Sequence, residues 1–141
     1  MFRKIVQTDS SSATILIRMM VGLVFFTEGL QKFMFPDKLG AGRFAKIGLP
    51  DPAFLAPFAG AFEIACGFLL LIGLTTRLAA IPLLCVISVA IATTKVQFFY
   101  ANGFWPTLHE GRADWAMLMG LIFLLIKGGG KWSFDNLLWN K

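Results

Sequence analysis

Apolar residues occur in four long runs along the chain, and short polar segments separate them. A membrane-spanning helix needs about 20 mostly apolar residues. The first three runs meet this length, and the fourth meets it once its polar start is included. The runs cover about 13–33, 52–74, 78–98 and 108–127. This pattern predicts an all-α membrane protein, in which residues 1–141 form one domain folded as a four-transmembrane-helix bundle.

Local signals set the expected ends of the second and fourth spans. Pro52 suits the first position of a helix, and Gly73 is typical of a helix C-terminus. The uncharged part of the fourth span has only 12 residues, so its helix is expected to begin upstream, near Leu108. Thr107 and Glu110 have the spacing of a capping box, which favours this start.

The linker between the first two spans mixes apolar and basic residues. Within 34–51, Phe35 and Phe44 are interspersed with Lys38 and Lys46. Amphipathic segments of this kind lie in the lipid headgroup layer. We therefore expect a short interfacial segment between helices 1 and 2.

The composition fits a chain embedded in a lipid bilayer. Of 141 residues, 57% are hydrophobic and 15% are charged, against about half and a quarter in soluble domains. The net charge is +5, but the Lys and Arg residues lie mostly between the apolar runs and form no basic cluster. This arrangement favours contact with the membrane surface and argues against a nucleic-acid partner. Four spans would put both termini on one side, and we prefer the cytoplasmic side because the terminal segments then need no translocation.

Arg18 and Glu63 are charged residues within the first and second spans. A charge at the bilayer centre costs roughly 2.5–3.5 kcal/mol, so each needs a partner. If the two helix centres are aligned, Arg18 lies about 7.5 Å from the depth of Glu63, and its side chain can cover this distance. Gly22, Gly29 and Lys32 share a face with Arg18, and Gly60 shares one with Glu63. Small residues on such faces favour close helix packing. We predict an Arg18–Glu63 pair, which either locks the helices or forms a catalytic site.

Further charges gather at the opposite end of the spans. They are Glu28 and Lys32 in the first span, Lys95 in the third, and His109 and Asp114 in the fourth. They are candidate cofactor-binding residues, and the alternative is ordinary charge at helix ends. A single histidine with scattered carboxylates has no metal-ligand spacing, so no metal is expected. The sequence also has no CxxC and no ligand set for haem, flavin or an iron–sulfur cluster.

Four stretches carry a recognisable pattern: 18-RMMVGLVFFTEGLQKF-33, 48-GLPDP-52, 60-GAFEIACGFLLLIGLTTRLAA-80 and 128-GGGKWSFDNL-137. Together they resemble the DoxX family of small four-helix membrane proteins, which is related to the small membrane subunit of thiosulfate:quinone oxidoreductase. Family members often have His where Glu28 stands and Gly-Pro-Gly where this chain has 128–130. The resemblance implies a multi-pass protein of the bacterial inner membrane. Arg18, Glu63 and Asp135 are its family-matching positions.

The resemblance favours a quinone-interacting or redox-associated membrane subunit. Quinone would carry the chemistry, and electrons would come from a soluble or membrane redox partner. One alternative is an adaptor that anchors a soluble enzyme at the membrane. Another is a small-solute permeation subunit, for which four short spans would require a homo-oligomer. The sequence leaves open whether the chain is itself an enzyme.

Overall fold

A computed structural model describes residues 7–139, and this part of the chain is helical, without a strand. Three helical segments are long and apolar enough to cross a membrane. They are α2 (Thr14–Met34), α5 (Pro52–Ile72) and the continuous segment Thr76–Asn102. The predicted all-helical fold is confirmed, and the described residues contain three spans of this kind instead of the four predicted.

The predicted fourth span is divided between two helices. α8 (Phe104–Glu110) and α9 (Arg112–Lys127) meet at Gly111, whose backbone has φ −87° and ψ 4°. These angles lie between the helical and extended regions, and they interrupt the helix. The predicted continuous helix from Leu108 to Lys127 is therefore wrong. α9 alone, with 16 residues, is about 24 Å long, shorter than the roughly 30 Å hydrocarbon layer.

The predicted capping box before this span is also wrong. Thr107 lies inside α8, and its hydroxyl donates to the carbonyl of Gly103 at 2.7 Å. α8 begins directly after Gly103, which has a positive φ of 85° that glycine adopts readily. The helix therefore starts earlier than the side-chain signal indicated.

The other ends follow the sequence more closely. Pro52 is the first residue of α5, and Gly73 ends that helix in the left-handed conformation with φ 73°. The third span is longer than expected, because α6 (Thr76–Ala90) continues through a π-helical turn, η1 (Ile91–Lys95), into α7 (Val96–Asn102). π turns inside α-helices occur frequently at functional sites.

The linker after α2 forms two short helices, α3 (Pro36–Leu39) and α4 (Ala41–Lys46). They pack against each other, and α4 packs against the start of α5. A distinct segment between the first two spans is thus present, as predicted.

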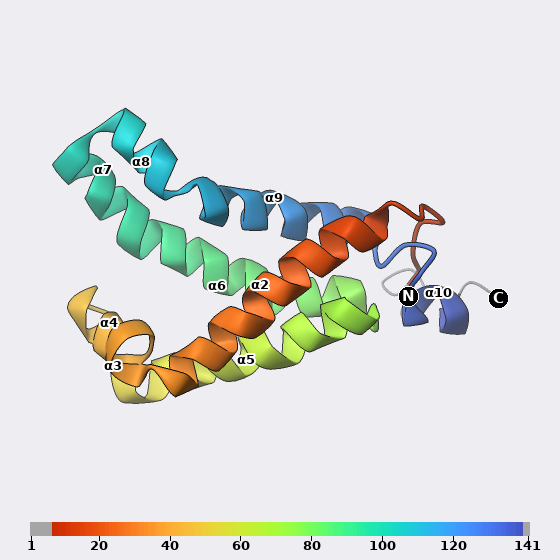
Figure 1. The fold of residues 1–141 in the computed structure, drawn as a ribbon, viewed down its shortest axis with the longest axis horizontal. Helices are drawn as coiled ribbons and strands as arrows, with labels where there is room; N and C mark the ends of the chain where they lie inside the picture. The colour runs from red at the N-terminus through yellow and green to blue at the C-terminus, as the bar shows by residue number, and fades with distance from the viewer. Residues whose placement is uncertain (1–6, 140–141) are drawn as a thin grey trace.

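Antiparallel helices α2 and α5 pack closely through glycines (Figure 1). A Cβ atom on Gly29 would lie 2.7 Å from the carbonyl oxygen of Gly60, and one on Gly67 would lie 2.7 Å from the backbone nitrogen of Phe26. These distances are too short for any side chain, so the glycines permit the contact. The predicted packing of small-residue faces is confirmed.

The helices form two pairs, α2 with α5 and α6 with α9. The pairs meet around a core that includes Val21, Leu70, Leu83 and Leu121, each with 0% of its surface exposed. Figure 1 shows that the pairs come together towards α10 (Phe134–Trp139) and diverge towards α3–α4 and α7–α8. We call the first end the closed end and the second the open end.

Candidate functional site

Arg18 forms its hydrogen bonds at the closed end of the bundle. Its side chain is 3% exposed, and its guanidinium donates to the carbonyl of Gly129 at 2.7 Å and to that of Trp132 at 2.5 Å. Glu63 has another partner. The predicted Arg18–Glu63 ion pair is therefore wrong.

The reason is the register of the two helices. A Cβ atom on Gly29 would lie 2.9 Å from the Cβ of Glu63, so Glu63 is level with Gly29. Gly29 is 11 positions after Arg18, which corresponds to about 16 Å along the helix. The prediction aligned the helix centres and put Arg18 about 7.5 Å from the depth of Glu63, whereas in the structure α2 is displaced along α5 by about 9 Å more, which exceeds one turn.

Lys32 takes the place that Arg18 was expected to fill. Its Nζ lies 2.8 Å from Oε2 of Glu63, and the two side chains are 11% and 4% exposed. Lys32 was already predicted to share the packing face of Arg18. The sequence thus indicated the correct face of α2. The register of α2 against α5 determines that Lys32, and not Arg18, reaches Glu63.

A second ion pair joins the other two helices of the bundle. Nζ of Lys95 lies 3.2 Å from Oδ2 of Asp114, and the side chains are 15% and 28% exposed. Lys95 ends the π turn η1, and Asp114 lies in the first turn of α9. This pair joins α9 to the third span at the open end.

Glu28 lies on the face of α2 that is turned towards α9. At the meeting point of α2 and α9, a Cβ atom on Gly120 would lie 2.5 Å from the side chain of Val21 and 3.7 Å from that of Ile17. Glu28 lies seven positions after Val21, on the same face of α2. Asp114 lies six positions before Gly120 in the antiparallel α9. Glu28 therefore lies at about the same depth along the bundle as the Lys95–Asp114 pair.

Glu28 is exposed, and within residues 7–139 it makes no ion pair. We define the open-end site as Glu28, Lys32, Glu63, Lys95 and Asp114. With three carboxylates and two ammonium groups ionised, this set has one excess negative charge, and Glu28 is the acid without a cation of its own.

His109 does not join the open-end site. It is exposed on α8, and its carbonyl accepts a hydrogen bond from the guanidinium of Arg112. The structure thus joins Lys95 to Asp114 and Lys32 to Glu63, and within residues 7–139 His109 takes part in neither ion pair. In the described residues, no group of three or more His, Cys, Asp or Glu side chains is arranged to hold a metal ion.

Asp135 fixes the segment after α9, residues 128–137, against the closed end. We call this segment the chain exit. Its carboxylate is 2% exposed and accepts hydrogen bonds from the backbone N–H groups of Thr75 at 2.6 Å and Thr76 at 2.8 Å, where α6 begins. Negative charge at a helix N-terminus is favourable. With the Arg18 contacts, this links the exit after α9 to α2 and α6, and it gives both buried residues a structural role.

The N-terminal segment completes the closed end. The backbone N–H of Asp9 donates to the carbonyl of Lys127 at 2.9 Å, and the hydroxyl of Thr8 accepts from the N–H of Gly130 at 2.6 Å. Nζ of Lys127 also donates to Oδ2 of Asp9 at 3.0 Å. This hydrogen bond holds the pKa of Asp9 below its ordinary value of 3.8.

Comparisons with known proteins agree with the fold. "Uncharacterized membrane protein Rv3486" of Mycobacterium tuberculosis is 48% identical, over 96% of this chain and 86% of that protein. "Putative oxidoreductase CatD" of Bacillus subtilis is 30% identical, over 86% of this chain and 84% of its own length. An uncharacterized protein of Haemophilus influenzae is 33% identical, over 89% of this chain and 90% of that protein. No solved structure gives a significant match.

The sequence model of one family, DoxX, matches residues 13–96. This region includes α2, α5, α6 and η1, and with them four of the five residues of the open-end site. The chain is therefore a membrane protein that belongs to the DoxX family.

Proposed function

We propose that the protein is a redox-associated subunit of the bacterial inner membrane that binds quinone at the open-end site. In this proposal α8 and α9 together form the fourth membrane crossing, so the bundle has four spans. Both termini then lie on the side of the closed end, which we assign to the cytoplasm. The α3–α4 segment lies in the headgroup layer of the other side.

The depth of the charged groups supports a functional role. Glu28 lies 14 positions from the start of α2, and Asp114 lies 13 positions from the end of α9. Both are therefore about 20 Å from the closed end along their helices. In the proposed topology the hydrocarbon layer of about 30 Å begins at the closed end, so both groups would lie inside it, where ionisable groups are costly and usually serve function.

Glu28 is the observation on which the proposal rests. The other four charges of the site are paired, and pairing alone explains their stability in the membrane. Glu28 makes no ion pair within residues 7–139, and helical periodicity puts it on the face of α2 that meets α9 at Val21. A lipid-soluble ligand could approach this face of α2 from the bilayer without crossing the polar surface.

The residue types suit a quinone head group. The ammonium groups of Lys32 and Lys95 can donate hydrogen bonds to carbonyl oxygens, and the carboxylate of Glu28 can exchange protons. Reduction of a quinone takes up two electrons and two protons. A partner protein would supply the electrons, since no ligand set for an electron carrier is apparent in the sequence. The similarity to a protein named as an oxidoreductase supports this assignment.

Binding of quinone to the purified protein tests the proposal. The protein would be reconstituted in lipid nanodiscs, and ubiquinone and menaquinone would be titrated separately. We expect saturable binding of at least one quinone, weakened about tenfold or more in Glu28→Gln, which removes the charge and keeps the size. Glu110→Gln is the matched control, because Glu110 is an exposed acid on α8 outside the site.

Equal binding by both variants and the wild type would contradict the assignment of Glu28. Retention of a soluble enzyme without any quinone binding would instead support the membrane adaptor. Flux of a solute through proteoliposomes without quinone binding would support the permeation subunit.

A further inference from the structure

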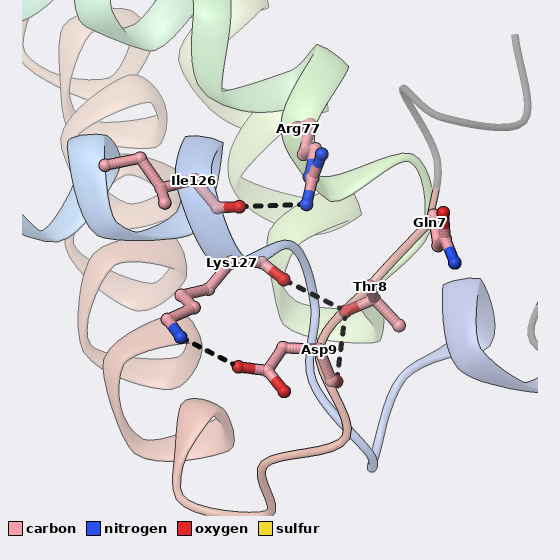
Figure 2. Close-up of a pocket in the computed structure, with 6 residues that line it drawn as sticks. All are labelled: Gln7, Thr8, Asp9, Arg77, Ile126 and Lys127. Atoms are coloured by element: carbon pink, nitrogen blue, oxygen red, sulfur yellow. Dashed lines mark hydrogen bonds and ion pairs between the residues drawn. The ribbon is translucent and has the colours of Figure 1, made fainter. Parts of the chain in front are cut away.

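A cavity of about 240 Å³ lies at the closed end, away from the open-end site. It is formed where α6 begins, where α9 ends and where the N-terminal segment crosses them (Figure 2). Its lining consists of Gln7, Thr8, Asp9, Arg77, Ile126 and Lys127. The proposed quinone function uses none of these residues.

The cavity lining has a net positive charge. Arg77 and Lys127 contribute two cations and Asp9 contributes one anion, which leaves one positive charge. Nη2 of Arg77 donates to the carbonyl of Ile126 at 2.8 Å, and Figure 2 shows how this bond holds the guanidinium beside the end of α9. A guanidinium has five N–H donors and stays positively charged, so it can hold several acceptors at once, an anion included.

Lys127 can also turn to an added anion. Its side chain is 50% exposed, and that of Asp9 is 37% exposed. Exposed ion pairs of this kind contribute little to stability, so an anion can compete with the Asp9 carboxylate for the ammonium group. The structure already holds one anionic group, the Asp9 carboxylate, against Lys127.

Exposed apolar side chains occur in the cavity lining and on α6 just after Arg77. Ile126 is 64% exposed in the cavity lining, and on α6 Leu78 and Ile81, which follow Arg77, are 37% and 48% exposed. The polar cavity therefore lies where the apolar surface of the helices ends, which is the level of lipid headgroups. Basic pockets between membrane helices at this level bind anionic headgroups.

From the charge, the donors and the position, we propose that this cavity binds the phosphodiester group of an anionic membrane lipid. Arg77 and Lys127 bind the phosphate oxygens, and the single negative charge of the diester balances the lining. An acyl chain lies along Leu78 and Ile81. Free phosphate has the same oxygen chemistry but lacks the apolar part that these two side chains contact.

Lipid retention measured by native mass spectrometry tests this site. Protein would be released from nanodiscs of phosphatidylcholine that contain a minor fraction of phosphatidylglycerol, and the bound lipids would be identified. We expect selective retention of phosphatidylglycerol. Arg77→Gln should weaken its binding about tenfold, the effect of one charge-assisted hydrogen bond. Lys131→Gln is the control, since Lys131 is an exposed cation in the chain exit that does not line the cavity.

Asp9→Asn separates binding from a loss of folding, because it should act in the opposite direction. Removal of the competing carboxylate leaves Lys127 to the lipid, so retention of phosphatidylglycerol should increase. Lys127→Gln should decrease it, and this surface change is expected to leave the fold intact.

Equal retention of phosphatidylglycerol by all variants would overturn the site. A second titration would add inorganic phosphate to the protein in neutral detergent. If phosphate alone bound as tightly as the lipid and displaced it, the lipid assignment would be overturned in favour of a soluble anion. Weak binding of phosphate beside selective lipid retention would support the proposal.

Discussion

The ion pair between Lys32 and Glu63 gives a sharp prediction on stability. Removal of one partner from a buried pair leaves an uncompensated charge, which typically costs about 3–5 kcal/mol. Lys32 is 11% exposed in the pair, so Glu63→Gln should lower the free energy of unfolding by an amount in this range. Lys32→Met should also destabilise the protein, and less strongly, because the carboxylate that remains can take up a proton.

The double variant Lys32→Met/Glu63→Gln should recover part of this loss. A buried ion pair and an uncharged pair of similar volume often differ little in stability. The two single effects should therefore be non-additive, with a coupling of about 1–3 kcal/mol. Unfolding in mixed detergent micelles, followed by circular dichroism, would supply the four free energies.

Arg18 provides the matched control for this cycle. Arg18→Gln removes two charge-assisted hydrogen bonds to carbonyls, each worth about 1.5–3 kcal/mol, so it should destabilise strongly by itself. Because Arg18 lies about 16 Å along α2 from the level of Glu63, its effect and that of Glu63→Gln should add. Strong coupling of Glu63 to Arg18, with none to Lys32, would refute the helix register described above.

Three further predictions concern the closed end and the helix contact. Asp135→Ala should cost about 3 kcal/mol or more in unfolding free energy, because two backbone N–H groups at the start of α6 lose a charged acceptor; Asp135→Asn should cost less. Gly29→Ala should cost about 1–3 kcal/mol in the same assay, because the new Cβ would lie 2.7 Å from a carbonyl oxygen of α5. The lowered pKa of Asp9 predicts that the small contribution of its pair with Lys127 is complete above the ordinary value of 3.8 and is lost as the pH falls through the lowered pKa. Asp9→Asn should remove that part of the pH dependence of the thermal midpoint.

The helix faces could be predicted from the sequence, whereas the register could not. Helical periodicity fixes which residues share a side, and it correctly placed Gly29 and Lys32 on the face of α2 that meets Glu63. The displacement of one helix along another depends on contacts between distant segments. Here the chain exit after α9 holds Arg18 through the carbonyls of Gly129 and Trp132. Backbone acceptors carry no sequence signal, so this partner could not be foreseen.

The break at Gly111 could not be predicted for a related reason. Thr107 and Glu110 have the spacing of a capping box, and that pattern favours a helix start at Leu108. The structure places Thr107 within α8, which begins after Gly103, so the capping-box spacing does not mark a helix start here. The charged residues of the open end were nevertheless identified, because ionisable groups inside an apolar run stand out without knowledge of their contacts. Their pairing, Lys95 with Asp114 and Lys32 with Glu63, required the structure.

The most direct test of the proposed function is photolabelling by a quinone. An azido-quinone would be bound to the protein in nanodiscs and activated by light, and the labelled peptides would be mapped by mass spectrometry. The account predicts label in α2 around Glu28 and in the first turns of α9 around Asp114, with competition by unlabelled quinone. Specific label confined to the closed end around Arg18, or no label that unlabelled quinone can displace, would contradict a quinone site at the open end.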